Sequence, residues 1–352
     1  MGVTDRLERL GADDLPVSPE AAGVLLILLT LLLLVAPFGV PLPGWAIVFL
    51  EVGVTFLLYG LLVLGLNLQF GFTGLVNFGH VAFFAVGAYA AAMLTASDPF
   101  VGIGLGYPWP VGLAAGIVAA SLLGAFIGVA TLRLRDDFLA IATLAVAEIL
   151  HDLLGSFEGI TGADIGILGV PQPVAALASD SDTNLVATVF LFAGTLLLTY
   201  AAVARLTGAP YGRVLRAIRA DDRVTAALGK HVFGYELQAF VFGAALAGLA
   251  GVLFGFYNGA VAPGFFGLNV TVLVWIGMLV GGAGNNRAVL AGLAIILGLR
   301  LATRFLNQQL PFVSQDQFAS VRLVLVGLVL ILVIRYRPAG IWGDAEKLGF
   351  ER

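Results

Sequence analysis

Cysteine is absent from this chain of 352 residues, and only 11% of its residues are charged. The lack of thiols excludes disulfide bonds, iron–sulfur clusters and thiol catalysis. A soluble domain carries about 25% charged residues, so this shortage of charge indicates that lipid is the main solvent. The formal net charge of −4 argues against nucleic acid as a partner.

Hydrophobic residues make up 60% of the chain, and the mean hydropathy is +1.01. A helix needs roughly 20 apolar residues to cross a bilayer. We therefore predict an all-α integral membrane protein with about ten transmembrane helices over residues 21–337. A polar cytoplasmic N-terminal tail over 1–20 and a cytoplasmic C-terminal tail over 338–352 flank this domain. Apolar runs and their breakers place the spans near 21–37, 45–66, 79–96, 110–132, 138–154, 185–206, 237–258, 267–283, 288–305 and 319–336.

The distribution of basic residues predicts the orientation. The loops 97–109, 155–184 and 259–266 contain no Lys or Arg. The positive-inside rule then predicts that both termini are cytoplasmic in a multi-pass protein of the cytoplasmic membrane. All basic residues except Arg300, Arg304 and Arg322 lie on the inner side in this arrangement. The polar stretch before the first apolar run argues against a signal peptide.

Residues 66–94 place polar side chains inside an apolar region. Asn67, Gln69, Asn77 and His80 occur there beside several glycines. Polar groups at membrane depth usually face the protein interior or a water-filled cavity, and interrupted helices are tolerated only in such places. We predict an interrupted helix at this point, with the four residues as candidates for lining a translocation path. The alternative is that Asn77 and His80 merely bond neighbouring helices.

Residues 211–240 form the longest polar segment between predicted spans. If the segment is helical, Arg213, Arg216, Arg219 and Arg223 lie on one stripe, with Leu215 roughly opposite. A basic amphipathic helix on the cytoplasmic side can lie on anionic lipid headgroups. It can equally serve as the docking site of a cytosolic partner, and the residues by themselves do not favour either reading.

The remaining motifs give little further evidence about function. Glu148, His151 and Asp152 lie close on one predicted span, and a proton-coupled transporter could use such a set. Residues 281–284 (GGAG) resemble a phosphate loop only superficially, because no Lys-Ser/Thr pair follows, and a tight turn is the better reading. Small-xxx-small spacing such as Gly251/Gly255 predicts close helix packing. No metal site and no cofactor are predicted.

Five stretches together resemble the branched-chain amino acid (leucine–isoleucine–valine) ABC permeases. They cover roughly residues 45–343 in order, and two of them, 131–150 and 212–229, point to the LivM-like subunit. They are the glycine-rich stretch 66–94, TLRLRDDFLAIATLAVAEIL (131–150), GRVLRAIRADDRVTAALG (212–229), AFVFGAALAGLAGVLFG (239–255) and RYRPAGIWG (335–343).

The resemblance implies a permease fold that works with partners. These are a second, homologous permease, two cytosolic ATP-binding subunits and an extracytoplasmic protein that delivers the amino acid. It also implies that the segment of about 211–235 couples to the ATPases, which resolves the choice above in favour of docking. The chain itself would be no enzyme. The residues implied are Arg213, Arg216, Arg219, Asp221, Asp222, Ala226, Ala227 and Gly229, although Asp221 and Asp222 stand earlier than the family pattern places its acidic residue.

Two other functions stay open at this stage. Permeases for urea or short amides share the architecture, and a single sequence does not separate their substrates. A self-sufficient secondary transporter would need a charged pathway or a broken-helix repeat in both halves, whereas this chain shows one glycine-rich break.

Overall fold

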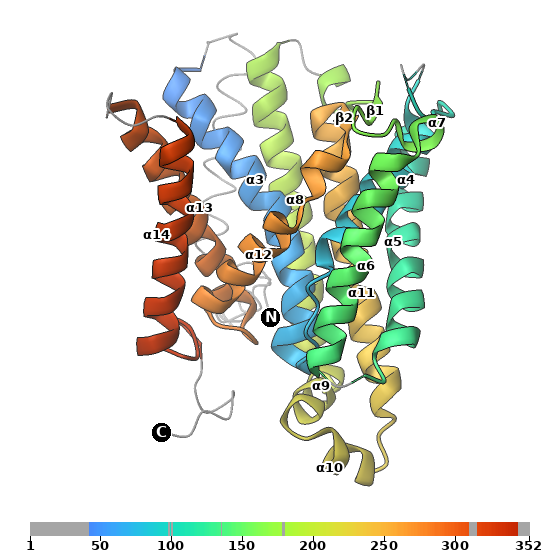
Figure 1. Ribbon diagram of the computed structural model, residues 1–352, viewed down its shortest axis with the longest axis vertical. Helices are drawn as coiled ribbons and strands as arrows, with labels where there is room; N and C mark the ends of the chain where they lie inside the picture. The colour runs from blue at the N-terminus through green and yellow to red at the C-terminus, as the bar shows by residue number, and fades with distance from the viewer. Residues whose placement is uncertain are drawn as a thin grey trace, which may run out of the picture.

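The computed structural model describes residues 42–343, apart from 98, 100, 135, 178–179 and 310–314 (Figure 1). Helices dominate this part of the chain, and only two short strands occur in it. The main helices are α3 (Gly44–Leu66), α4 (His80–Thr95), α5 (Trp109–Thr131), α6 (Asp136–Ser156), α8 (Ser181–Gly208), α11 (Val232–Asn258), α12 (Leu268–Gly281), α13 (Asn286–Gln309) and α14 (Gln315–Tyr336). The shorter elements are η1 (Asn67–Phe72), α7 (Glu158–Thr161), β1 (Ile167–Leu168), η2 (Ala175–Leu177), α9 (Pro210–Ala220), α10 (Asp222–Ala227), β2 (Ala260–Val261) and η3 (Pro263–Phe266).

The nine main helices coincide with nine of the predicted spans. Within the described residues, seven helical stretches are long and apolar enough to cross a membrane, whereas 80–95 and 324–336 form shorter apolar helices. The predicted span 21–37 and the N-terminal tail lie outside the described residues. The prediction of an all-α membrane protein is therefore confirmed, and the total of ten spans stays a prediction.

Helix α11 forms the centre of one half of the bundle and packs against α3, α4 and α5. Its most apolar 18-residue stretch is 67% buried, the highest value among the candidate spans. Glycines make this packing possible: neither Gly87 of α4 nor Gly251 of α11 has room for a Cβ, because each lies against the backbone of the other helix. Lipid gives apolar helices no hydrophobic reason to associate, so close backbone contact supplies the attraction. The predicted packing role of the glycine spacing is confirmed.

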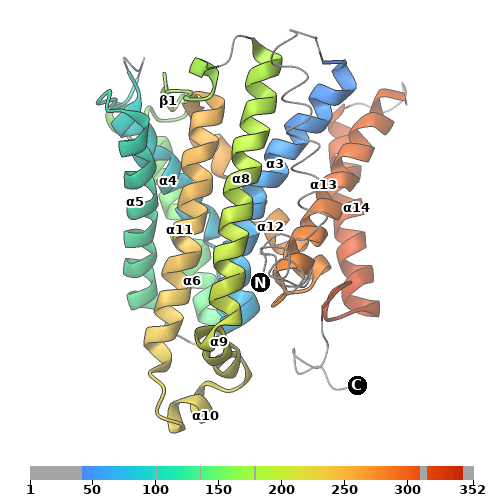
Figure 2. The same ribbon diagram turned by 180° about the vertical axis from the view of Figure 1, so that it is seen from behind.

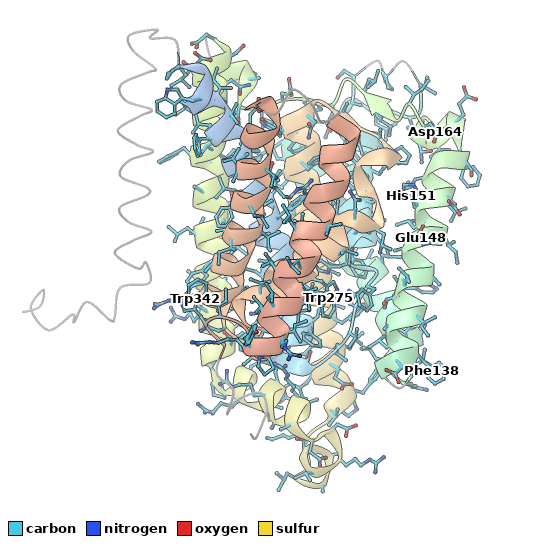
Figure 3. All side chains as sticks on the ribbon, turned by 60° about the vertical axis from the view of Figure 1, so that its left-hand side comes forward. Phe138, Glu148, His151, Asp164, Trp275 and Trp342 are labelled. Atoms are coloured by element: carbon cyan, nitrogen blue, oxygen red, sulfur yellow. The ribbon has the colours of Figure 1, made fainter. Side chains whose placement is uncertain are left out.

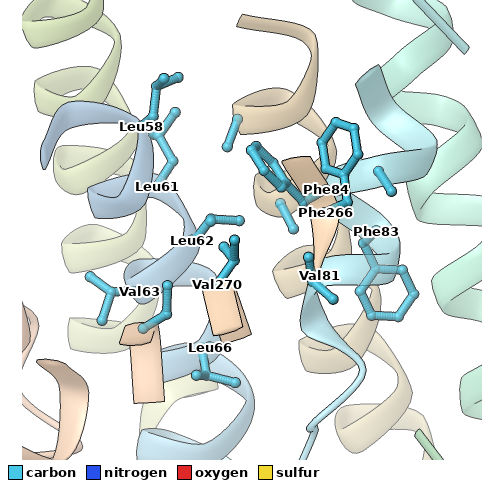
Figure 4. Close-up of a cluster of buried hydrophobic side chains, with 14 of the residues drawn as sticks. Leu58, Leu61, Leu62, Val63, Leu66, Val81, Phe83, Phe84, Phe266 and Val270 are labelled. Carbon is cyan, nitrogen blue, oxygen red and sulfur yellow. The ribbon is translucent and has the colours of Figure 1, made fainter. Parts of the chain in front are cut away.

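Large apolar side chains fill the space between α3 and α4 (Figure 4). Leu61 and Leu62 of α3 and Phe83 and Phe84 of α4 are all 1% exposed. The ring of Phe84 lies 5.0 Å from that of Phe266 in η3, at 69°. Edge-to-face contacts of this kind add to the packing energy, and they fix α4 between α3 and the segment that leads into α12.

The two ends of the bundle differ (Figures 1 and 2). At one end the antiparallel pair β1 and β2 joins Ile167 to Val261 and Leu168 to Ala260. At the other end α9 and α10 project beyond the long helices. Asp221 separates these two helices and caps α10, because its Oδ1 accepts a hydrogen bond from the Val224 N–H at 2.9 Å. The predicted single stripe of arginines is therefore broken between Arg219 and Arg223.

Candidate functional site

The chain leaves regular α-helix at η1, a π-helical turn that continues α3. Beyond it, Gly74 has a positive φ of 83°, and regular helix resumes only at His80. The predicted interruption is confirmed. Single π-turns often occur at functional sites, and this one is almost completely buried.

Asn67 joins η1 to the turn between α12 and α13. Its amide Nδ2 donates to Oδ1 of Asn286 at 2.8 Å, and its Oδ1 accepts from the Gly284 N–H at 2.8 Å. Asn286 in turn donates to the Thr207 hydroxyl at 3.3 Å, which brings in the end of α8. Gly284 has a φ of 88°, which glycine adopts without strain, so residues 281–284 form a tight turn as predicted.

A second chain of hydrogen bonds runs from Gln69 across the interruption. Gln69 donates to the Phe240 carbonyl of α11 at 2.8 Å and accepts from the Asn77 amide at 2.9 Å. The Asn77 carbonyl accepts from the Trp275 indole of α12 at 3.0 Å, and its side-chain oxygen accepts from the Gly79 N–H at 2.9 Å. The non-helical backbone of 74–79 is thus held by side chains, which is why it can exist at membrane depth.

His80 opens α4 and bonds back to α3. Its Nε2 lies 3.1 Å from the Leu62 carbonyl oxygen, so the tautomer with a proton on Nε2 fits the site. Its Nδ1 has no partner among the described residues. The ring packs edge-on to Phe83 at 6.3 Å, and only 1% of the residue is exposed.

All four predicted path residues are therefore buried in helix-to-helix contacts. Asn67, Gln69 and Asn77 have no exposed surface in the single chain. The structure links Gln69 with Asn77 but gives Asn67 and His80 separate partners. Sequence reasoning missed the residues that complete the network, which are Thr207, Trp275, Gly284 and Asn286. The adjacent Asn285 and Asn286 at the start of a span were the available signal for the last of these.

Helix α9 packs its apolar face against the interruption. Leu215 is fully buried and Ile218 is 4% exposed, and Leu215 shares a cluster with Leu68 and Phe72 of η1. The predicted amphipathic character is confirmed. Ala226, Ala227 and Gly229 lie exposed beyond it, and Gly229 adopts a φ of 78° that ends α10.

Two arginines of α9 turn toward η1. Arg219 donates to the carbonyl of Gly71, and its guanidinium lies 5.4 Å from the centre of the Phe70 ring. Arg216 lies 5.8 Å from the Phe72 ring and donates to the Thr207 carbonyl at 3.3 Å. Burial lowers the pKa of Arg219, because a desolvated guanidinium holds its charge less favourably than one in water.

A cavity of about 1110 Å³ lies between α9 and the α12–α13 turn. Its lining combines polar and apolar side chains, and Arg216, Arg219 and Arg287 give it a positive charge. Trp342, labelled in Figure 3, also borders it. None of the four predicted path residues lines this cavity, although Gly71 and Phe72 of η1 do.

The acidic set on α6 lies on the outside of the bundle (Figure 3). Glu148 and Asp152 are exposed, while His151 is half-buried and its Nδ1 has no partner among the described residues. In the described part of the chain, no group of three or more His, Asp or Glu side chains gathers as a metal site. His231 instead caps α11, because its Nδ1 accepts from the Gly234 N–H at 3.0 Å.

The sequence of the chain is similar to those of known membrane permeases. Residues 48–334 match the model for the permease component of branched-chain amino acid transport systems. A probable branched-chain amino acid transport permease protein LivM of Methanocaldococcus jannaschii is 27% identical, over 81% of this chain and 90% of its own length.

Two permeases of Escherichia coli K12, both named as high-affinity branched-chain amino acid transport system proteins, are also similar. LivM is 31% identical over 81% of this chain and 68% of its own length. LivH is 27% identical over 82% of this chain and 92% of its own. No solved structure matches the chain. The match across the helical bundle confirms the resemblance read from the motifs: the chain belongs to the family of branched-chain amino acid transport permeases and is LivM-like.

Proposed function

We propose that the chain is one membrane-spanning subunit of an ABC importer that carries branched-chain amino acids across the cytoplasmic membrane. The family match and the names of the LivM and LivH relatives support this substrate class. The sequence contains no G-x-x-x-x-G-K-[S/T] phosphate loop. We therefore assign ATP hydrolysis to two cytosolic partner subunits and no catalytic role to this chain.

The contact between α9 and η1 is the observation that carries the mechanism. Arg219 ties the Gly71 carbonyl to α9, and Leu215 anchors the same helix in the cluster around Phe72. A partner that pulls on α9 and α10 therefore pulls on the interrupted helix as well. Rigid elements joined by such contacts move together.

From η1 the displacement has two routes into the bundle. Asn67 leads to Asn286 and so to the start of α13. Gln69 leads to α11 through Phe240 and to α12 through Asn77 and Trp275. We propose that closure of the ATPases is transmitted along these hydrogen bonds and switches the membrane domain between outward-facing and inward-facing states.

In this proposal α9 and α10 face the cytoplasm with both chain termini. The surface offered to the ATPase comprises the exposed Arg213 and Arg216, the cap residue Asp221, Asp222 in the first turn of α10, and the end of α10. The opposite end, with β1 and β2, faces the extracytoplasmic binding protein. Glu158 and Asp164 are exposed there, whereas Asp180 caps α8 by accepting from the Thr183 N–H at 3.1 Å.

Asn67, Gln69, Asn77 and His80 remain the candidates for the translocation path, and their hydrogen bonds support a positioning role within it. Replacing Asn77 and His80 together with alanine tests both ideas at once. Uptake should fall while the assembled complex is recovered in normal amount. Uptake at the wild-type level would remove both residues from the mechanism.

The assembly is tested by purifying the tagged chain from its native membrane in mild detergent and identifying the co-purified proteins by mass spectrometry. We expect a second permease and two ATPase subunits, and leucine uptake that depends on ATP after reconstitution. Urea uptake in place of leucine would overturn the substrate assignment. Transport by the chain alone without ATP would favour a secondary transporter, and ATP turnover by the chain alone would refute the assignment of hydrolysis to partners.

A further inference from the structure

Helix α6 is the least buried of the candidate spans. Only 22% of its most apolar 18-residue stretch is buried, against 67% for α11. It lies on the front face of the bundle in Figure 1, and in Figure 3 the helix that carries Glu148 and His151 forms the edge of the bundle. One whole side of this helix therefore meets something outside the chain.

The exposed side of α6 carries charge as well as apolar surface. Ile141, Ala145, Glu148 and Asp152 recur at intervals of three and four residues and are all exposed, so they form one face. Ala147, on the other side, is 5% exposed. Among the described residues no hydrogen bond or ion pair reaches either carboxylate. We call Ile141, Ala145, Glu148 and Asp152 the acidic face of α6.

Glu148 lies well inside the α6 span and not at its end. It precedes the helix end at Ser156 by eight residues, which is about 12 Å at a rise of 1.5 Å per residue. The hydrocarbon core is roughly 15 Å thick from one surface to the middle. Ionisable side chains at such depth almost always face a protein interior or water, because hydrocarbon cannot solvate them.

Neighbouring α5 shows what a lipid-compatible face looks like in this protein. Val118, Leu122 and Phe126 are 55%, 65% and 74% exposed, and no ionisable residue occurs between Trp109 and Thr131. Glu51, two turns from the start of α3, is a further exposed carboxylate in a described span. α6 differs from both helices, because it carries two acidic residues on one exposed face and is also the least buried of the candidate spans.

We propose that the acidic face of α6 packs against the second permease subunit, with water along Glu148 and Asp152 between the two chains. This inference rests on the proposed function. The partner is argued from the relatives: LivM and LivH of one organism are both similar to this chain along most of its length and are both named permeases. Two chains of one fold pair most simply about a pseudo-two-fold axis, so α6 meets the same region of its partner.

Spin labels test this proposal cleanly, since the chain has no cysteine of its own. Ala145→Cys and Glu148→Cys are labelled in the complete reconstituted complex, with Leu122→Cys on α5 as the lipid-facing control. We expect severalfold lower access of dissolved oxygen at the Ala145 variant than at the Leu122 variant. The Glu148 variant should instead be reached by a water-soluble nickel chelate. If Glu148→Cys fails to fold, the Ala145 comparison alone decides.

The possible outcomes distinguish failure of this inference from failure of the proposed function. An intact, transporting complex whose Ala145 label is as accessible to oxygen as the Leu122 label overturns this inference and leaves the proposed function standing. An Ala145 label that is already shielded in the isolated chain shows that the chain covers its own face, which also overturns it. Purification without any second permease overturns both.

Discussion

Removing the guanidinium of Arg219 should uncouple ATP hydrolysis from transport. Arg219→Met keeps much of the side-chain length but deletes the hydrogen bond to the Gly71 carbonyl and the contact with the Phe70 ring at 5.4 Å. A hydrogen bond from a charged group contributes about 1.5–3 kcal/mol, and a cation–π contact adds about 0.5–1 kcal/mol. Loss of even about 2 kcal/mol changes an equilibrium roughly 30-fold.

The assay compares leucine uptake per ATP hydrolysed in vesicles containing the assembled complex. We expect the ATPase rate of Arg219→Met to stay near that of the unmodified complex, while uptake per ATP falls at least about tenfold, since the link between α9 and η1 is weakened by that order. Arg213→Met is the matched control, because Arg213 is exposed on the same helix. An intact Arg219→Met complex with normal uptake per ATP would refute the proposed route through η1.

Three further predictions concern stability and are read from thermal unfolding in detergent. Gly87→Ala should lower the free energy of unfolding by about 1–3 kcal/mol, because the new Cβ would meet the backbone of α11. Gly53→Ala is the control: a Cβ there has nothing within 4 Å, so this variant should have no such cost. Asn77→Leu should cost about 1–3 kcal/mol because it leaves the Gln69 amide oxygen unpaired, and combining it with Gln69→Leu should cost less than the sum; strict additivity would contradict a coupled pair. Burial, together with the electrostatic effect of nearby Tyr235, raises the pKa of Tyr211 from 10.0 to about 12. Between these values the folded state keeps a proton that the unfolded state loses, so the free energy of unfolding should fall as pH rises from 10 to 12. Tyr211→Phe should flatten that part of the pH profile, and an unchanged slope would assign it to other groups.

The sequence by itself determined that the chain lies in lipid, that it is helical and to which family it belongs. Apolar runs of spanning length leave no other way to satisfy the backbone in lipid, so the nine main helices of the described residues lie where the runs predict them. The interruption near Asn67 and the turn at 281–284 were also predictable. Glycines grouped with polar residues in an apolar stretch indicate a place where a helix ends or is interrupted, because non-helical backbone at membrane depth must be buried in protein.

Only the tertiary structure decided what the polar residues do. Asn67 and Asn286 are separated by more than two hundred positions in the chain, and no local pattern indicates that their amides bond. Arg213 and Arg219 have the same chemistry on one short helix, yet one is exposed and the other reaches Gly71. Helical periodicity assigns residues to faces, whereas the neighbour that each face meets depends on how distant helices pack, and this packing selects Arg219 as the link between α9 and η1.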